Sequence, residues 1–245
     1  MAKKVLSAKL ASRKPARKGA SASADAKKPA KLAPIRCETT LAAVLDALRA
    51  ADPALVERML AEAGPPPLRA RTPDFAGLAW IVVGQQVSTA SARAIHARLE
   101  AGFPGMVAAE IAAASDEALR ACGLSAPKIR TIRALADAIL GGRLDFDALA
   151  RMEASEAHAA LVALHGVGPW TADLFLLSCL GHPDAWPAGD LALQEAARLL
   201  LGLRARPDAK ALTRIGERWR PARAVAARLL WAWYGARKQA AARAP

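Results

Sequence analysis

The sequence is poor in cysteine and lacks long hydrophobic runs. Its three cysteines, Cys37, Cys122 and Cys179, are spaced far apart in a chain of 245 residues. This excludes a disulfide framework, a four-cysteine zinc site and a four-cysteine iron–sulfur cluster, and we expect inert thiols in a reducing compartment. No apolar run reaches the ~18 residues that a membrane span requires, and the N-terminus lacks the apolar segment of a secretory signal. No membrane partner is therefore expected.

Acidic residues are nearly absent from the first 36 residues, where most of the net positive charge lies. The formal net charge of the chain is +13. Residues 1–36 hold eleven of the 35 Lys and Arg residues but a single acid, Asp25, so that residues 37–245 are close to neutral. A like-charged segment of this kind binds phosphate backbones without recognising their sequence.

The same N-terminal segment also lacks residues that build a core. It is dominated by Lys, Ala, Ser and Pro, and it contains no aromatic residue. Such a composition buries too little apolar surface to offset the entropy of ordering the chain. We therefore predict a disordered basic arm over 1–36 and a globular domain over 37–245, in a cytoplasmic protein associated with a bacterial nucleoid. The arm is also compatible with an aid to solubility, an organelle transit peptide or a nuclear targeting signal.

The alternation of β-branched residues that marks strands is nearly absent after Thr39. Apolar residues instead recur at three- and four-residue spacing among many Ala and Leu, which favours helices. Thr72 is expected to cap a helix over Phe75–Gln86, and Ser88 is expected to cap the next one. Further helices are expected to begin near residues 115, 125, 155, 169, 190, 208 and 221, the one near 155 with Ser155 as its cap. The sequence therefore predicts an all-α protein of about ten short helices.

The segment Leu164–Asp173, with the sequence LHGVGPWTAD, is the most informative of the chain. Gly166 and Gly168 allow a tight turn with positive φ, and Pro169 suits the first turn of a helix. The N–H groups at such a helix start can bind a phosphate without a basic side chain. Taken alone, the segment is more typical of an ordinary turn between two helices.

An aspartate, Asp190, follows Gly168 by 22 positions and precedes an apolar helix. At that place Asp190 suits an N-cap. Together, however, the hairpin and this aspartate resemble the helix–hairpin–helix DNA glycosylases, in which a Leu-x-Gly-Val-Gly hairpin precedes a loop with one essential aspartate. The resemblance implies a two-lobed helical fold with the active-site cleft between the lobes.

Further segments extend the resemblance over most of residues 72–235. The segment Phe75–Ser88 is similar to the helix and loop that carry the intercalating residue of the family, and Cys122–Ile129 is similar to its middle segment. Trp219–Trp231 resembles the C-terminal helix of the 3-methyladenine DNA glycosylase II branch.

Two absences narrow the branch that the chain resembles. Relatives that also cleave the strand carry a lysine at the position that matches Trp170, and without this amine the lyase route has no evident nucleophile. Other branches hold an iron–sulfur cluster on four C-terminal cysteines, whereas no cysteine follows Cys179. The resemblance therefore implies a monofunctional alkylbase glycosylase, a monomer that needs no cofactor and no catalytic metal. By the same analogy, carbonyl groups near Leu164 and Val167 are compatible with a structural monovalent cation.

The resemblance also implies roles for individual residues. Asp190 is the expected catalytic residue, which stabilises the oxocarbenium-like sugar and orients or deprotonates water. The expected base pocket contains Trp170, Trp231, Leu174 and Leu191, with leucines where relatives have tyrosine. The expected DNA-binding residues are Gln86 as the wedge, Ser88, Gly166, Val167, Gly168, Thr171 and Arg223, with Lys128 as a further phosphate contact. Trp219 and Trp233 are expected in the core, and the place of Trp186 stays open.

Three functions remain open at this point. The first is excision of alkylated bases of the 3-methyladenine and 7-methylguanine type from double-stranded DNA, which leaves an abasic site for base excision repair. The second is a DNA-binding or damage-sensing module without catalysis. The third is removal of a different base, such as uracil, hypoxanthine or ethenoadenine. Any such enzyme must take its base out of the stack, and indole rings stack well on electron-poor alkylated bases.

Overall fold

The structure is a computed structural model that describes residues 32–243, and this part consists of helices and loops only. The prediction of an all-α protein is confirmed. Residues 1–31, which hold most of the predicted arm, lie outside the described residues. The elements are α1 (Glu38–Ala51), α2 (Pro53–Ala63), α3 (Phe75–Gly84), α4 (Thr89–Gly102), η1 (Pro104–Met106), α5 (Ala108–Ala113), α6 (Asp116–Ala121), α7 (Ala126–Leu140), α8 (Phe146–Arg151), α9 (Ala154–Val162), α10 (Pro169–Ser178), α11 (Leu191–Leu200), α12 (Ala209–Gly216), η2 (Glu217–Trp219) and α13 (Arg223–Arg243).

The helix starts follow from side-chain oxygens that accept the first free backbone N–H groups. Ser88 caps α4 as predicted, since its hydroxyl accepts from the N–H of Ser91 at 3.1 Å. The prediction that Thr72 caps α3 is wrong, because the carboxylate of Asp74 accepts from the N–H of Gly77 at 2.8 Å.

A second predicted cap is also displaced. Glu153, and not Ser155, stands at the N-cap of α9.

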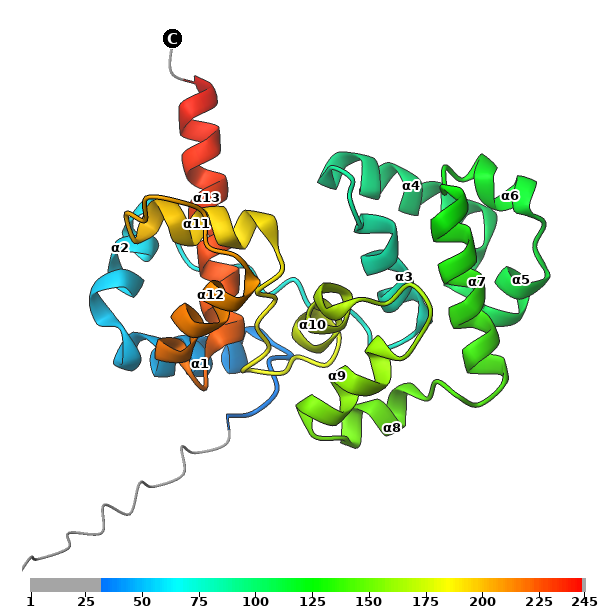
Figure 1. Cartoon of the computed structure of the whole chain (residues 1–245), viewed down its shortest axis with the longest axis horizontal. Helices are drawn as coiled ribbons and strands as arrows, with labels where there is room; N and C mark the ends of the chain where they lie inside the picture. The colour runs from blue at the N-terminus through cyan, green and yellow to red at the C-terminus, as the bar shows by residue number, and fades with distance from the viewer. Residues whose placement is uncertain (1–31, 244–245) are drawn as a thin grey trace, which may run out of the picture. The chain divides into compact units, whose positions relative to one another are not determined.

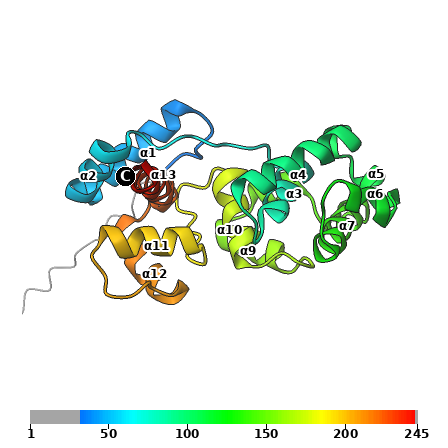
Figure 2. The same cartoon turned by 90° about the horizontal axis from the view of Figure 1, so that it is seen from above.

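The helices form two groups, and each group packs around one helix of its own. In one group α13 packs against α1, α2 and α11, and in the other α7 packs against α3, α5 and α6. Helix α10 packs against α3 and α9 of the second group, and the chain then returns to the first group through the loop before α11. Figures 1 and 2 both show α10 beside α3 and α9. The loop after α10 therefore lies where the two groups meet.

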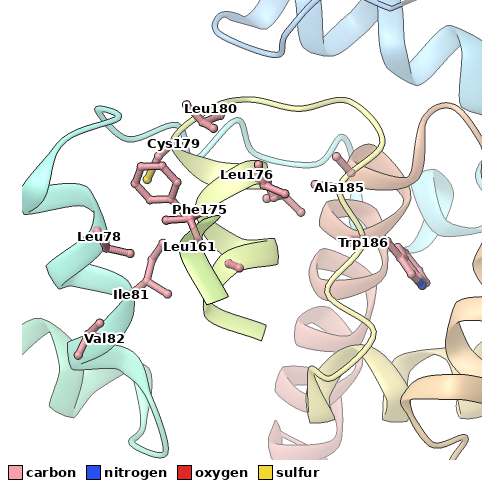
Figure 3. Packing of buried hydrophobic residues seen from close by; sticks show 14 of the residues in the cluster. Leu78, Ile81, Val82, Leu161, Phe175, Leu176, Cys179, Leu180, Ala185 and Trp186 are labelled. Carbon is pink, nitrogen blue, oxygen red and sulfur yellow. The ribbon is translucent and has the colours of Figure 1, made fainter. Parts of the chain in front are cut away.

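The position of α10 is determined by apolar side chains at its contact with α3. Phe175 of α10 is fully buried, and Leu78 and Val82 of α3 are fully buried as well. In Figure 3 the ring of Phe175 lies on the side of α10 that faces Leu78 of α3. Because burying one such side chain contributes about 1.5–3 kcal/mol, this contact holds the start of α10 at a defined distance from α3.

The globular part begins before residue 37, where the sequence had placed its start. Ile35 is fully buried, and its N–H donates to the carbonyl of Gly181 at 2.7 Å. The guanidinium of Arg36 donates to the carbonyl of Cys179 at 2.7 Å. These two residues are therefore part of the packed domain, and the predicted boundary of the arm is a few residues too late.

No helix among residues 32–243 is long and apolar enough to cross a membrane.

Candidate active site

Asp190 lies at the N-cap of α11 with both carboxylate oxygens occupied by N–H donors. Its Oδ1 accepts from the backbone N–H of Leu193 at 2.8 Å and from Nε1 of Trp231 at 3.0 Å. Its Oδ2 accepts from Nε1 of Trp170 at 2.9 Å. Indole N–H groups only donate, so the arrangement suits a carboxylate that accepts on both oxygens. Three donors from α10, α11 and α13 therefore hold the charged group in one orientation.

The loop that carries Asp190 is itself held by hydrogen bonds. The N–H of Asp190 donates to the carbonyl of Pro187 at 2.9 Å. Nε2 of Gln194, which is buried on α11, donates to the carbonyl of Ala188 at 2.9 Å. The aspartate is therefore positioned by its own loop as well as by its three donors.

Asp190 borders a cavity of about 590 Å³. Ligand pockets commonly have volumes of about 300–1,000 Å³, so the cavity is large enough for one nucleobase. The predicted pocket residues Trp170, Leu174 and Trp231 line it, together with Asp190. The fourth, Leu191, is not among the lining residues; it points its side chain largely into solvent, with 61% of its surface exposed, because it is the first residue of α11.

The structure gives Trp170 and Trp231 a contact that the sequence did not predict. Both had been expected to stack on a base, but the N–H edge of each ring is committed to Asp190. The other tryptophans of this region lie in the core. Trp219 and Trp233 are fully buried as predicted, and Trp186, whose place the sequence left open, is 5% exposed.

The hairpin before α10 requires a glycine at one of its two glycine positions. Gly166 has φ of +75°, and a Cβ at this residue would collide with the side chain of Thr131 on α7. Gly168, by contrast, has φ of −88° and forms the N-cap of α10. The positive φ that the sequence predicted for this turn is therefore found at Gly166 and not at Gly168.

Space is nevertheless open around Gly168. A Cβ there would meet no other residue within 4 Å. The first N–H groups of a helix have no partner inside it, so the start of α10 offers donors at an unobstructed surface. The N–H of Val167 does not add to them, because it donates to the carbonyl of Leu164 at 3.2 Å.

A glutamine next to the predicted wedge connects α3 to the hairpin. Nε2 of Gln85 donates to Oγ1 of Thr171 at 2.9 Å and to the carbonyl of Gly166 at 3.2 Å. Gln86 itself is exposed and has φ of +55° in the turn between α3 and α4. Gly84 and Thr89, on either side of this turn, line the cavity of Asp190. The turn that carries Gln86 and Ser88 therefore borders the cavity.

Three basic or polar residues expected at the DNA have internal partners instead. The guanidinium of Arg223 is buried and pairs with the carboxylate of Asp184 at 2.8 Å, so it does not face solvent. Lys128 is buried and donates from Nζ to the carbonyl of Val83 at 2.7 Å, where it caps the end of α3. The hydroxyl of Thr171 is 2.9 Å from Gln85 and buried. These internal contacts were not predicted, because a sequence does not show which polar groups lie beside a carboxylate or carbonyl after folding; the contact of these residues with DNA stays a prediction.

The cavity also contains residues that the sequence analysis did not single out. Trp80 of α3 lines it, and so do Arg71 and Arg228. Cζ of Arg71 lies 3.7 Å from the centre of the Trp80 ring. A lone tryptophan on an apolar helix has the pattern of a core residue, so periodicity offered no signal for this site.

A second cavity, of about 860 Å³, is lined by the opposite face of α10. It contains Asp173, whose Oδ1 lies 3.5 Å from Nε2 of His158. Burial raises the pKa of Asp173 to about 7, and the charge of Arg223 opposes this rise. Trp170 lines both cavities. The two aspartates therefore lie on either side of one helix in different environments.

Comparison with known proteins gives the family. Residues 79–221 match the family described as HhH-GPD superfamily base excision DNA repair protein. A stretch of 110 residues is 44% identical to a protein of Mycobacterium tuberculosis named "Probable bifunctional transcriptional activator/DNA repair enzyme AlkA"; it covers 44% of this chain and 21% of that relative. The chain thus spans about a fifth of the length of this relative.

Solved structures with the same fold cover far more of the chain. The 3-methyladenine DNA glycosylase Mag1 of Schizosaccharomyces pombe, in complex with abasic DNA, has a TM-score of 0.71 and 27% identity, covering 77% of this chain and 95% of that one. A DNA-3-methyladenine glycosidase of Bacillus halodurans has a TM-score of 0.65 and 33% identity, covering 80% and 91%. The hairpin, the aspartate at the cavity and these matches agree: the chain belongs to the HhH-GPD superfamily of base excision DNA repair proteins.

Proposed function

We propose that the protein is a monofunctional DNA glycosylase that excises alkylated bases, of the 3-methyladenine and 7-methylguanine type, from double-stranded DNA and leaves an abasic site. The observation that carries the proposal is the carboxylate of Asp190, held by three N–H donors at the border of a cavity that is large enough for one base. The 3-methyladenine glycosylases among the similar structures support the choice of substrate.

The chemistry follows from the charges of substrate and site. A base alkylated at N3 or N7 is cationic, so when the C1′–N bond breaks the bonding electrons leave with the base, which becomes neutral. The sugar acquires oxocarbenium character and is stabilised by the nearby carboxylate of Asp190. Water then bonds to C1′ and loses its proton, for which Asp190 is the proposed acceptor.

On the DNA side, we propose that the start of α10 contacts a phosphate and that Gln86 enters the duplex. The first N–H groups of α10 have no partner inside the helix and the space beside Gly168 is open, so backbone donors and the positive end of the helix favour an anion there. Gln86 is exposed in the turn that borders the cavity, so its side chain is available to fill the space of an extruded base. Gln85, next to Gln86, connects these two features through its hydrogen bonds to Gly166 and Thr171. A monomeric state and a cytoplasmic location remain predictions.

The test is release of free bases from duplex DNA that has been methylated with dimethyl sulfate. We expect the wild-type protein to release 3-methyladenine and 7-methylguanine, and Asp190→Asn to lower the rate by about 10²–10³-fold, which is the usual loss for one electrostatic contact to a transition state. Asparagine is as good an N-cap as aspartate, so α11 is expected to stay folded.

The control is the affinity of both proteins for duplex DNA that contains an abasic-site analogue, measured by fluorescence anisotropy. We expect Asp190→Asn to bind this DNA nearly as well as the wild type. Full base release by the variant would contradict the role of Asp190. Tight binding by the wild-type protein, without release of any base, would instead indicate a damage-sensing module.

A further inference from the structure

The guanidinium of Arg71 lies over the indole of Trp80 in the wall of the cavity. Its Cζ is 3.7 Å from the centre of the Trp80 ring, a distance at which cation and indole attract each other. The backbone N–H of Arg71 donates to the carbonyl of Ser178 at 2.9 Å, at the end of α10. Backbone and side chain are thus both held, and the guanidinium lines the same cavity as Asp190.

Arg71 has no anionic partner within the described part of the chain. No carboxylate of residues 32–243 forms an ion pair with Arg71, and no hydrogen bond joins its side chain to another of these residues. His96 also contacts Trp80, with ring centres 4.2 Å apart, but burial and the charge of Arg71 lower the pKa of His96 and favour its neutral form. The N–H groups of Arg71 therefore remain available to a ligand.

Hydrogen-bond donors outnumber acceptors among the side chains that line this cavity. Four arginines, Arg69, Arg71, Arg93 and Arg228, contribute to its wall, whereas Asp190 is the only carboxylate that residues 32–243 place there. Both oxygens of Asp190 already accept hydrogen bonds. A base that presents a carbonyl oxygen therefore meets donors, whereas a base that presents an amino group meets few free acceptors.

Arg228 adds to this excess of donors, because its own hydrogen bonds occupy backbone carbonyl acceptors. Its Nε donates to the carbonyl of Leu68 and its Nη2 to that of Leu177, each at 3.0 Å. Its Nη1 is buried and makes no hydrogen bond within the described residues. Burial lowers the pKa of Arg228 to about 10, so the group stays cationic at neutral pH.

We propose that Arg71, stacked on Trp80, determines specificity in the base pocket by donating to the exocyclic oxygen of guanine-type lesions. This inference rests on the proposed function. The positive wall repels every cationic alkylated base to a similar extent, so charge alone does not distinguish alkylguanine from alkyladenine. The hydrogen bond does, because O6 of guanine accepts from a guanidinium, whereas the N6 amino group of adenine leaves the guanidinium unpaired.

The experiment compares 3-methylguanine with 3-methyladenine, released from dimethyl-sulfate-treated duplex DNA and separated by chromatography. The two lesions carry the methyl group at the same position and the same charge. We expect Arg71→Ala to lower the ratio of their kcat/KM values, guanine over adenine, by about tenfold, the usual loss for a hydrogen bond to a charged group. Arg71→Gln, which keeps N–H donors without the charge, is expected to retain part of the preference.

The matched control is Arg93→Gln, which removes another arginine of the same cavity wall that does not stack on Trp80. We expect it to leave the ratio unchanged, and thermal unfolding checks that each variant is folded. An unchanged ratio in Arg71→Ala would overturn the inference while leaving the proposed function intact. The ratio is also unchanged if kcat/KM rises equally for both bases, and Arg71 would then only cover the indole. If the wild-type protein releases neither base, the proposed function fails and the inference fails with it.

Discussion

The two aspartates on either side of α10 differ in how the fold satisfies their charge. Asp190 borders the first cavity and accepts three hydrogen bonds from N–H donors. Asp173 borders the second, where a single histidine nitrogen lies 3.5 Å away and burial raises its pKa to about 7. Residues 170, 174 and 177 of α10 line the first cavity, and residues 169, 173 and 176 line the second. The two faces of α10 thus border cavities in which an aspartate has different hydrogen-bond partners.

From this difference we propose that the donors around a carboxylate, and not its distance from the hairpin, distinguish the catalytic aspartate. Asp173 is closer in sequence to the hairpin than Asp190 and is also partly buried. It lacks the donors that orient a charged carboxylate, and it faces away from the cavity that Trp80, Trp170 and Trp231 line. A stabiliser of positive charge must be ionised and oriented before the reaction begins, which favours Asp190.

The largest expected effect separates the two aspartates by their contribution to catalysis. Whereas Asp190→Asn is expected to lose about 10²–10³-fold in base release, we expect Asp173→Asn to change it by less than about threefold, because a group outside the reacting pocket makes no contact with the transition state. Single-turnover rates on methylated duplex DNA measure both variants. Equal losses would remove the distinction between the two cavities.

The hairpin that begins α10 allows a second comparison, between its two glycines. Gly166→Ala combines positive φ with a collision against Thr131, so we expect the free energy of unfolding to fall by about 3 kcal/mol. Gly168→Ala has ordinary φ and free space, so a loss under about 0.5 kcal/mol is expected. Urea denaturation measures both values. A similar loss in the two variants would contradict the assigned geometry of the turn.

Replacing the two indoles that donate to Asp190 tests whether their N–H groups orient its carboxylate. Trp170→Phe and Trp231→Phe each keep an aromatic ring but remove one N–H donor to the carboxylate. We expect each to lower base release about tenfold, the usual value for a hydrogen bond to a charged group. The matched control is Trp186→Phe, whose N–H donates to the carbonyl of Leu212 at 3.1 Å, away from Asp190. If the control loses as much activity as the other two, ring packing rather than hydrogen bonding explains the losses.

The last comparison concerns the dependence of stability on pH. The folded-state pKa of Asp173, about 7, lies above the ordinary value of 3.8, so the folded protein binds the proton more tightly than the unfolded chain. The stability from this proton is complete below about pH 4 and is lost as the pH rises through 7, on the order of 1 kcal/mol per pH unit. Asp173→Asn removes this dependence, so we expect it to raise the melting temperature at pH 8 and to leave it nearly unchanged at pH 4. Calorimetry at both pH values checks the sign; a variant that is less stable at pH 8 would contradict it.

Sequence patterns predicted the local features of the site better than its contacts. The cap at Ser88 and the turn at Gly166 depend on residues within a few positions, which a sequence displays directly. The cap of α3 was misplaced from Asp74 to Thr72 because both residues are good caps and only the packing of the helix selects one.

Contacts between distant residues could not be predicted in the same way. Arg223 and Lys128 had the charge of phosphate contacts, but the fold places a carboxylate and a carbonyl beside them. Trp80 had the pattern of a core residue, yet it lines the cavity beneath Arg71. Each of these outcomes depends on which helices become neighbours, and that is decided by the packing of the whole domain.

The sequence by itself determined that the chain is helical, that a tight hairpin precedes one helix and that a single aspartate caps another, because these features depend on nearby residues. The tertiary structure alone decided that Trp170 and Trp231, 20 and 41 positions away from Asp190, donate to it. It also decided that Asp173 takes up its proton near neutral pH and that Arg71 stays without a carboxylate partner among the described residues. The physical reason is that hydrogen bonds and charge interactions at a site act over a few ångströms, and only folding brings distant parts of the chain that close.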